Sequence, residues 1–126
     1  MLYELKIRSR FSAAHRIREY GGKCEELHGH NWLVEVVVGS DVIDSNGLVI
    51  DFKDLKKITG EVLDAIDHRF LNEVPPFDKA NPTSENLSKY IYEEVSAKLP
   101  GGHLQVSFVT VWESEDACAT YRGSGG

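Results

Sequence analysis

The sequence predicts an α+β domain in which two strand hairpins flank two helices, in the order ββααββ. Two features of the apolar residues support this prediction. They alternate with a period of two at residues 2–11, 29–39 and 104–113, as in half-buried strands. They recur every three or four positions at residues 51–70 and 83–99, as in amphipathic helices. We therefore expect a four-stranded antiparallel sheet with both helices on one face.

The first two strands form the first hairpin. The first runs into a segment of small residues, Phe11-Ser12-Ala13-Ala14-His15, after which a polar loop from Arg16 to Lys23 contains Gly21-Gly22, a turn signal. The second strand, Gly29 to Gly39, should lie antiparallel to the first. A hairpin also closes the domain, because a turn at residues 114–116 leads into a last strand from Ala117 to Arg122.

The first helix begins after a capping residue. Asp51 precedes an apolar stripe that continues as far as Phe70, so Asp51 is the expected N-cap. On this prediction Asp67 and His68 lie in the last turn of the helix, where a histidine favours the helix dipole.

The second helix also begins at a cap, either Thr83 or Ser84, and ends at Pro100. The segment between the helices, from Asn72 to Pro82, contains Pro75-Pro76 and cannot continue a helix. We therefore expect an irregular connector there.

Composition restricts the class of protein. The 126 residues, 41% of them hydrophobic, fit one domain over residues 1–122 with a flexible Gly/Ser tail at 123–126. The net charge is −6 and the basic residues are scattered, which argues against a nucleic-acid surface. Apolar runs are shorter than a membrane span requires, and the N-terminus lacks the pattern of a signal peptide. We expect a cytoplasmic protein with separate thiols at Cys24 and Cys118.

Three histidines form a candidate metal site. His28-Gly29-His30 places two imidazoles on one side of a strand, because side chains at i and i+2 share a face. His15 ends the neighbouring strand and should lie opposite them. Three protein ligands with one open position are typical of catalytic zinc, although three imidazoles also accept iron, nickel or cobalt.

Three further side chains have both a structural and a chemical interpretation. Cys24 is an incidental loop thiol, a fourth metal ligand, or a thiolate activated beside the metal. His68 is either a helix-end residue or a base oriented by Asp67. Glu113 is either an exposed strand-end carboxylate or an acceptor for paired N–H groups of a flat heterocycle. Spacing alone does not choose between these interpretations.

Seven ordered segments of the chain together form a recognisable pattern: Phe11-Ser12-Ala13-Ala14-His15, Cys24-x-x-x-His28-Gly29-His30, Val49-Ile50-Asp51-Phe52, Asp67-His68-x-x-Leu71-Asn72, Asn81-Pro82-Thr83-Ser84-Glu85-Asn86-Leu87, Trp112-Glu113-Ser114 and Cys118-x-x-Tyr121-Arg122-Gly123. Through these segments the chain resembles the 6-pyruvoyltetrahydropterin synthase and 6-carboxytetrahydropterin synthase family over nearly its whole length. The family's fold, the tunnelling fold, agrees with the order ββααββ. Its members commonly form homohexamers with active sites between subunits, so a homo-oligomer is implied.

The resemblance also implies roles for individual residues. Zinc is bound by His15, His28 and His30. An acid/base triad is formed by Cys24, Asp67 and His68. The pterin ring is anchored by Glu113, with help from Thr83 and Ser84.

The implied substrate is 7,8-dihydroneopterin triphosphate, for whose phosphates Arg16, Arg18 and Lys23 are candidates by proximity to the motif. The Cys-x-x-x-His-Gly-His spacing resembles the branch that releases acetaldehyde and triphosphate and forms 6-carboxy-5,6,7,8-tetrahydropterin for queuosine biosynthesis. The biopterin branch, which retains the pyruvoyl chain, is an alternative.

Glu25 makes a further product possible. The Cys-Glu-x-x-His-Gly-His variant resembles a subset of the family linked to a folate-type cleavage that gives 6-hydroxymethyl-7,8-dihydropterin. Glu25 is then an alternative base, and otherwise a solvated loop acid. A metal- or pterin-binding module without turnover is the alternative of another class, and such a module would not require Cys24 or the Asp67-His68 pair.

Overall fold

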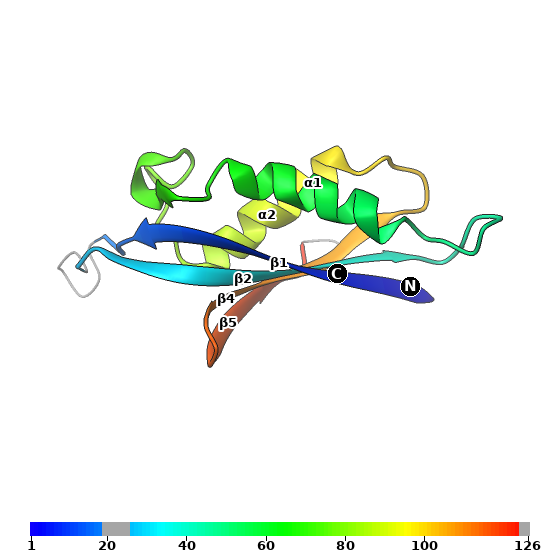
Figure 1. The fold of residues 1–126 in the computed structure, drawn as a ribbon, viewed down its shortest axis with the longest axis horizontal. Helices are drawn as coiled ribbons and strands as arrows, with labels where there is room; N and C mark the ends of the chain where they lie inside the picture. Colours follow the sequence, from blue (N-terminus) through cyan, green and yellow to red (C-terminus); the bar gives the residue numbers. More distant parts are fainter. Residues whose placement is uncertain (19–25, 124–126) are drawn as a thin grey trace.

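The computed structural model describes residues 1–18 and 26–123. Its elements, labelled in Figure 1 where there is room, are β1 (Tyr3–His15), β2 (His28–Ser40), α1 (Phe52–Asp64), β3 (Arg69–Phe70), a 3-10 helix η1 (Leu71–Glu73), α2 (Ser84–Lys98), β4 (Gln105–Ser114) and β5 (Ala117–Tyr121). The α+β class and the two helices agree with the prediction. Residues 124–126 of the expected tail lie outside the described residues. Neither α1 nor α2 has the length and apolar character that a membrane span needs.

The sheet has five strands in the order β3-β1-β2-β4-β5, which corrects the prediction of four antiparallel strands. The additional strand, β3, pairs parallel to β1, with Arg69 beside Ala13 and Phe70 beside Ala14. The other three pairings are antiparallel. A two-residue strand is too short to show a hydrophobic period, and for this reason the sequence did not reveal it.

Helix α1 ends earlier than its apolar stripe predicted. It stops at Asp64, and Phe70, which was expected on the helix, belongs to β3. Between them His68 takes a left-handed backbone conformation, with φ of 59°, which turns the chain toward the edge of β1. The prediction that Asp67 and His68 lie in the last helical turn is therefore wrong, because the pair follows the helix and contacts Ser12 of β1.

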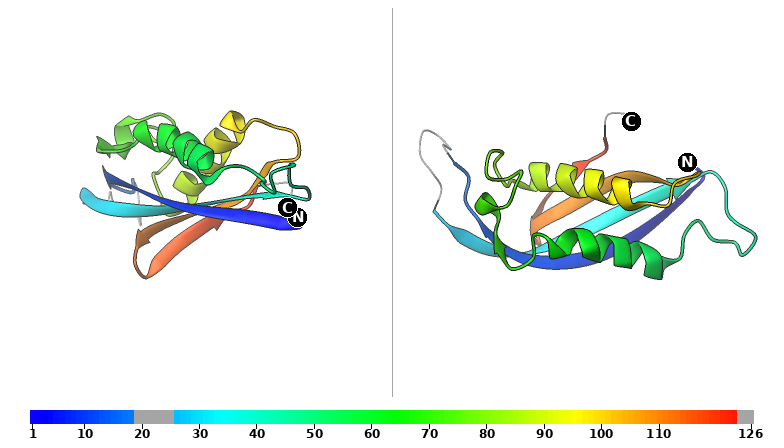
Figure 2. Two further views of the ribbon diagram at one scale, coloured as in Figure 1. Left: turned by 45° about the vertical axis from the view of Figure 1, so that its right-hand side comes forward. Right: turned by 90° about the horizontal axis from the view of Figure 1, so that it is seen from above.

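Both helices cover one face of the sheet, as Figures 1 and 2 show from three directions. Their N-caps are Asp51 and Thr83, whose side chains accept hydrogen bonds from the backbone N–H groups of Lys53 and Asn86, so the predicted caps are confirmed. The core between the layers includes Trp32, Val34 and Val36 of β2, Leu55 and Val62 of α1, and Leu87 and Ile91 of α2. Within residues 1–18 and 26–123, the other face of the sheet has no helix packed over it (Figure 1).

A buried carboxylate ties three strands together on that uncovered face. Glu35 of β2 accepts hydrogen bonds from Arg8 Nε at 3.0 Å and from Trp112 Nε1 at 2.8 Å. Burial works to raise the pKa of Glu35, but the hydrogen bonds from Trp112 and Arg8, together with the positive charges of Lys6 and Arg8, outweigh it, so the pKa lies below its usual value. The contact fixes the relative positions of β1, β2 and β4, from which the candidate site is built.

Candidate metal centre

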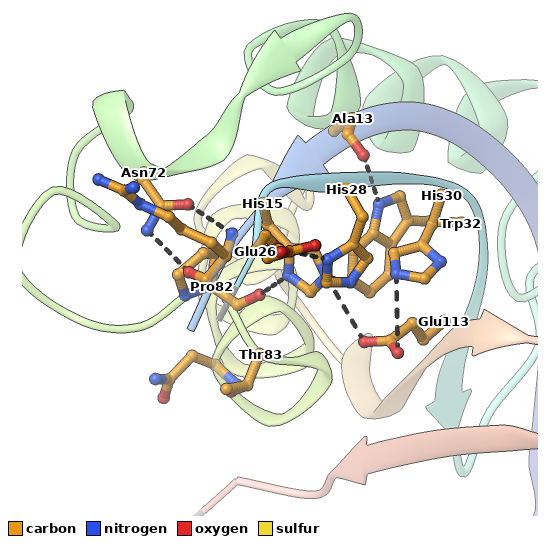
Figure 3. Close-up of polar contacts among 12 residues, drawn as sticks. Ala13, His15, Glu26, His28, His30, Trp32, Asn72, Pro82, Thr83 and Glu113 are labelled. Atoms are coloured by element: carbon orange, nitrogen blue, oxygen red, sulfur yellow. Dashed lines mark hydrogen bonds and ion pairs between the residues drawn. The ribbon is translucent and has the colours of Figure 1, made fainter. Parts of the chain in front are cut away.

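Three imidazoles meet where β1 ends and β2 begins. His15 lies directly opposite His28 in the strand register, and Ala13 opposite His30. One nitrogen from each of His15, His28 and His30 lies within 4.8 Å of the other two, and Figure 3 shows the rings turned toward one another. The alternation of β2 therefore brings the three histidines together, as the sequence predicted. Among the described residues these three form a group able to hold a metal ion.

Backbone carbonyls set the orientation of two of these rings. His15 Nδ1 lies 2.8 Å from the Pro82 carbonyl oxygen, and His28 Nδ1 lies 2.8 Å from that of Glu26. A carbonyl can only accept, so each Nδ1 carries a proton and donates it. In the neutral rings the two Nε2 atoms are then both lone-pair donors, and they face one another at 3.1 Å.

Two lone pairs at this distance repel unless a cation lies between them, either a proton on one ring or a metal ion. Imidazoles whose other nitrogen donates to a carbonyl are the usual ligands of metals in proteins. The donor set consists of nitrogens alone, and it suits zinc as well as iron, nickel or cobalt. The three histidines therefore fit a bound metal ion.

The side chains of Trp32 and Glu113 lie against the three histidines. Trp32 is fully buried, and its ring centroid lies 4.9 Å from that of His15 and 5.2 Å from that of His30. Glu113 Oε2 lies 3.7 Å from His15 Nε2, and Glu113 Oε1 lies 3.7 Å from His30 Nε2. The carboxylate is 36% exposed. It can thus meet both a metal-bound group and a ligand arriving from solvent.

The Asp67-His68 pair lies at the edge of the sheet, between β1 and β3. Asp67 Oδ1 accepts the backbone N–H of Ser12 and lies 2.9 Å from His68 Nδ1. The Ser12 N–H, and to a lesser extent His68, hold the pKa of Asp67 below its usual value against the opposing effect of burial. The His68 side chain is 81% exposed, and it borders a shallow cavity of about 520 Å³ that also touches Ser12 and Asn31. Asp67 thus orients His68 toward solvent.

The roles of the other predicted site residues stay predictions. Cys24, Glu25 and Lys23 lie outside the described residues. Thr83 accepts the Asn86 N–H as the cap of α2 at 3.1 Å, and Ser84 is the first residue of that helix.

Of the two candidate phosphate ligands that the structure describes, one already has a partner. Arg18 donates through its guanidinium to the Phe77 carbonyl at 2.7 Å, whereas the Arg16 side chain is exposed. Arg16 is therefore the better placed of the two to meet a phosphate.

The backbone groups that orient the histidines were not predicted from the sequence. The Pro82 carbonyl reaches His15 across 67 residues of sequence, and the Glu26 carbonyl reaches His28 from two residues away, outside either strand; periodicity reveals neither contact. Two asparagines, Asn72 and Asn81, bind the backbone of the segment that follows His15, but only Asn81 adjoins Pro82, whose carbonyl contacts a ligand. Both asparagines lie in the segments that resemble the family, but the resemblance implied no role for either of them.

The fold and the site together define an α+β protein with three histidines able to hold a metal ion at the end of a β-hairpin. The sequence profile of the 6-pyruvoyl tetrahydropterin synthase family matches residues 4–124. The chain belongs to this family, and membership places it among enzymes of a lyase family that acts on pterins.

Named relatives include more than one activity. A protein of Archaeoglobus fulgidus, provisionally named a 6-carboxy-5,6,7,8-tetrahydropterin synthase, is 43% identical over 92% of each chain. The dihydroneopterin monophosphate aldolase of Pyrococcus furiosus is 38% identical over 86% of this chain and 88% of its own. The structure of Caenorhabditis elegans 6-pyruvoyl tetrahydropterin synthase superposes with a TM-score of 0.85 at 29% identity, covering 97% of this chain and 96% of that one.

Proposed function

We propose that the protein is a zinc-dependent 6-carboxy-5,6,7,8-tetrahydropterin synthase. It would convert 7,8-dihydroneopterin triphosphate to 6-carboxytetrahydropterin, with release of acetaldehyde and triphosphate, for queuosine biosynthesis. The observation that carries the proposal is the convergence of the His15 and His28 Nε2 atoms at 3.1 Å, with each Nδ1 engaged by a carbonyl. The relative from Archaeoglobus fulgidus supports the choice of product.

The metal would be held by His15, His28 and His30. When bound, it supplies Lewis acidity toward the hydroxyl groups of the substrate side chain. Trp32 closes the inner side of the centre, so that substrate would enter from the side of Glu113. The Glu113 carboxylate would accept N–H groups of the pterin ring and set the distance between ring and metal. Thr83 and Ser84 would border the ring at the start of α2.

Cys24 and His68 would transfer protons. Asp67 orients the His68 ring through its contact with His68 Nδ1. We propose a homohexamer with active sites between subunits, in which the Asp67-His68 pair of one subunit serves the metal centre of a neighbour. The exposure of His68 at the sheet edge supports this arrangement, because a catalytic base needs access to its substrate.

A second candidate is cleavage to 6-hydroxymethyl-7,8-dihydropterin. The aldolase of Pyrococcus furiosus, whose name gives dihydroneopterin monophosphate as its substrate, favours this alternative. Glu25 follows Cys24 directly and would serve as the alternative base.

Product analysis separates the candidates. Purified metal-loaded protein is incubated with the triphosphate and, separately, with the monophosphate of dihydroneopterin, and the products are identified by mass spectrometry. Our assignment predicts 6-carboxytetrahydropterin and acetaldehyde from the triphosphate. Hydroxymethyldihydropterin without carboxytetrahydropterin would establish the second candidate instead. Binding without turnover of either compound would point to a non-catalytic module.

A further inference from the structure

The loop that enters α2 is fixed to the segment beyond His15 by one asparagine. Asn81 Oδ1 accepts the backbone N–H of Arg18 at 2.9 Å, and Asn81 Nδ2 donates to the Arg18 carbonyl at 3.2 Å. The Asn81 side-chain amide therefore makes the two backbone hydrogen bonds with Arg18 that a residue on a neighbouring strand would make. Asn81 is itself held, because its carbonyl accepts a hydrogen bond from Asn86 Nδ2 at 2.8 Å.

The next residue, Pro82, contacts the candidate metal ligand His15. Pro82 is buried, and its carbonyl is the acceptor for His15 Nδ1 at 2.8 Å. Thr83 anchors the far side of this carbonyl as the cap of α2. The Pro82 peptide group is thus held between Asn81 and Thr83, and Figure 3 shows it beside His15, on the side of the ring away from His30.

We propose that Asn81 is a positioning residue for the metal ligand His15, acting through the Pro82 carbonyl. This inference rests on the three-histidine centre of the proposed function. The carbonyl holds the proton of His15 on Nδ1 and so keeps the Nε2 lone pair directed at the metal. Without Asn81 the carbonyl loses its fixed place, His15 can rotate or carry its proton on Nε2, and the ring becomes a poorer ligand. Groups that orient metal ligands in this way typically contribute tenfold to a hundredfold in metal affinity.

The chain contains a matched control for this effect. Asn72 makes the same pair of contacts with Arg16, accepting its N–H at 2.9 Å and donating to its carbonyl at 2.9 Å. Asn72 does not adjoin the Pro82 carbonyl. Asn72→Ala therefore removes the same two kinds of hydrogen bond while leaving the acceptor of His15 in place.

The test measures affinity for Zn²⁺ alone, without a pterin. The full-length protein is stripped of metal, and its dissociation constant is determined by competition with a chromophoric chelator for wild type, Asn81→Ala, Asn81→Asp, Asn86→Ala and Asn72→Ala. The visible spectrum of each Co²⁺-loaded protein reports ligand geometry, and thermal unfolding of the metal-free proteins reports stability.

We expect Asn81→Ala to bind Zn²⁺ about tenfold to a hundredfold more weakly, with an altered Co²⁺ spectrum. Asn86→Ala should weaken binding by a smaller factor, and Asn72→Ala should stay within about threefold of wild type even if it unfolds at a lower temperature. Should Asn81→Ala fail to fold, Asn81→Asp decides, because it keeps the acceptor for the Arg18 N–H and loses only the donor. That variant should bind several times more weakly than wild type.

Equal affinity and spectra in wild type and the folded Asn81 variants would overturn the inference, as would an equal loss in Asn72→Ala. Wild-type protein that binds no stoichiometric Zn²⁺ would instead overturn the metal centre of the proposed function. The two failures are therefore distinguishable.

Discussion

Replacing Glu113 by Ala should weaken substrate binding while sparing the metal. The carboxylate is proposed to accept two N–H groups of the pterin ring, and a hydrogen bond to a charged group contributes about 1.5–3 kcal/mol. Two such bonds sum to about 3–6 kcal/mol, and because Glu113 is 36% exposed, we discount this sum for solvent screening to about 2–3 kcal/mol. This corresponds to a fall in kcat/KM of roughly 30- to 160-fold. KM should carry most of the change, because the ring contacts are made before and during reaction.

The assay combines steady-state kinetics on dihydroneopterin triphosphate with elemental analysis of the protein. Metal content should stay at the wild-type value because all three imidazoles remain. Glu115→Gln is the control, since it neutralises an exposed carboxylate in the turn between β4 and β5, two residues beyond Glu113. Kinetics for Glu113→Ala within twofold of wild type would refute the anchoring role, and loss of the metal would make Glu113 part of the metal centre instead.

Three further predictions concern the proton-transfer groups. Cys24→Ala should lower turnover by roughly 100-fold or more and leave metal content unchanged; a loss of stoichiometric metal would show that Cys24 is a ligand. His68→Asn should lower kcat by a similar factor with little change in KM or metal content, and normal kcat would exclude His68 as a proton carrier. The lowered pKa of Asp67 means that its carboxylate stabilises the fold above the unfolded pKa of about 3.9 and that this contribution is lost as pH falls through the lowered value. In urea unfolding between about pH 5 and pH 2, Asp67→Asn should therefore lose less stability than wild type, and parallel curves would contradict this.

The parts that followed from the sequence are those set by local periodicity. Alternation along residues 29–39 placed His30 on the same side as Trp32, and the structure shows both rings in contact. The antiparallel pairing that brings the end of β1 beside the start of β2 follows from the short separation of the two strands in the sequence. The caps at Asp51 and Thr83 were likewise readable, because a cap depends on residues within one turn.

The parts that did not follow depend on contacts between distant segments. The apolar residues Ile66 and Phe70 continue the helical period of α1, but Asp67 and His68 bind the backbone of Ser12 and turn the chain into β3. Asn81 precedes Pro82, whose carbonyl contacts His15 at a sequence separation of 67 residues. No local pattern predicts a contact over this separation. Tertiary hydrogen bonds thus decided both the end of α1 and the support of the metal centre.

The most direct measurement of the central claim is the position of the metal itself. Crystals of the zinc-loaded protein, measured on both sides of the zinc absorption edge, give an anomalous difference map that locates the ion. Our account predicts one peak per chain at about 2.0–2.1 Å from a nitrogen of each of His15, His28 and His30, with a further position open toward Glu113. A peak that involves the Cys24 thiolate as a fourth ligand, or that lies away from these imidazoles, would contradict it.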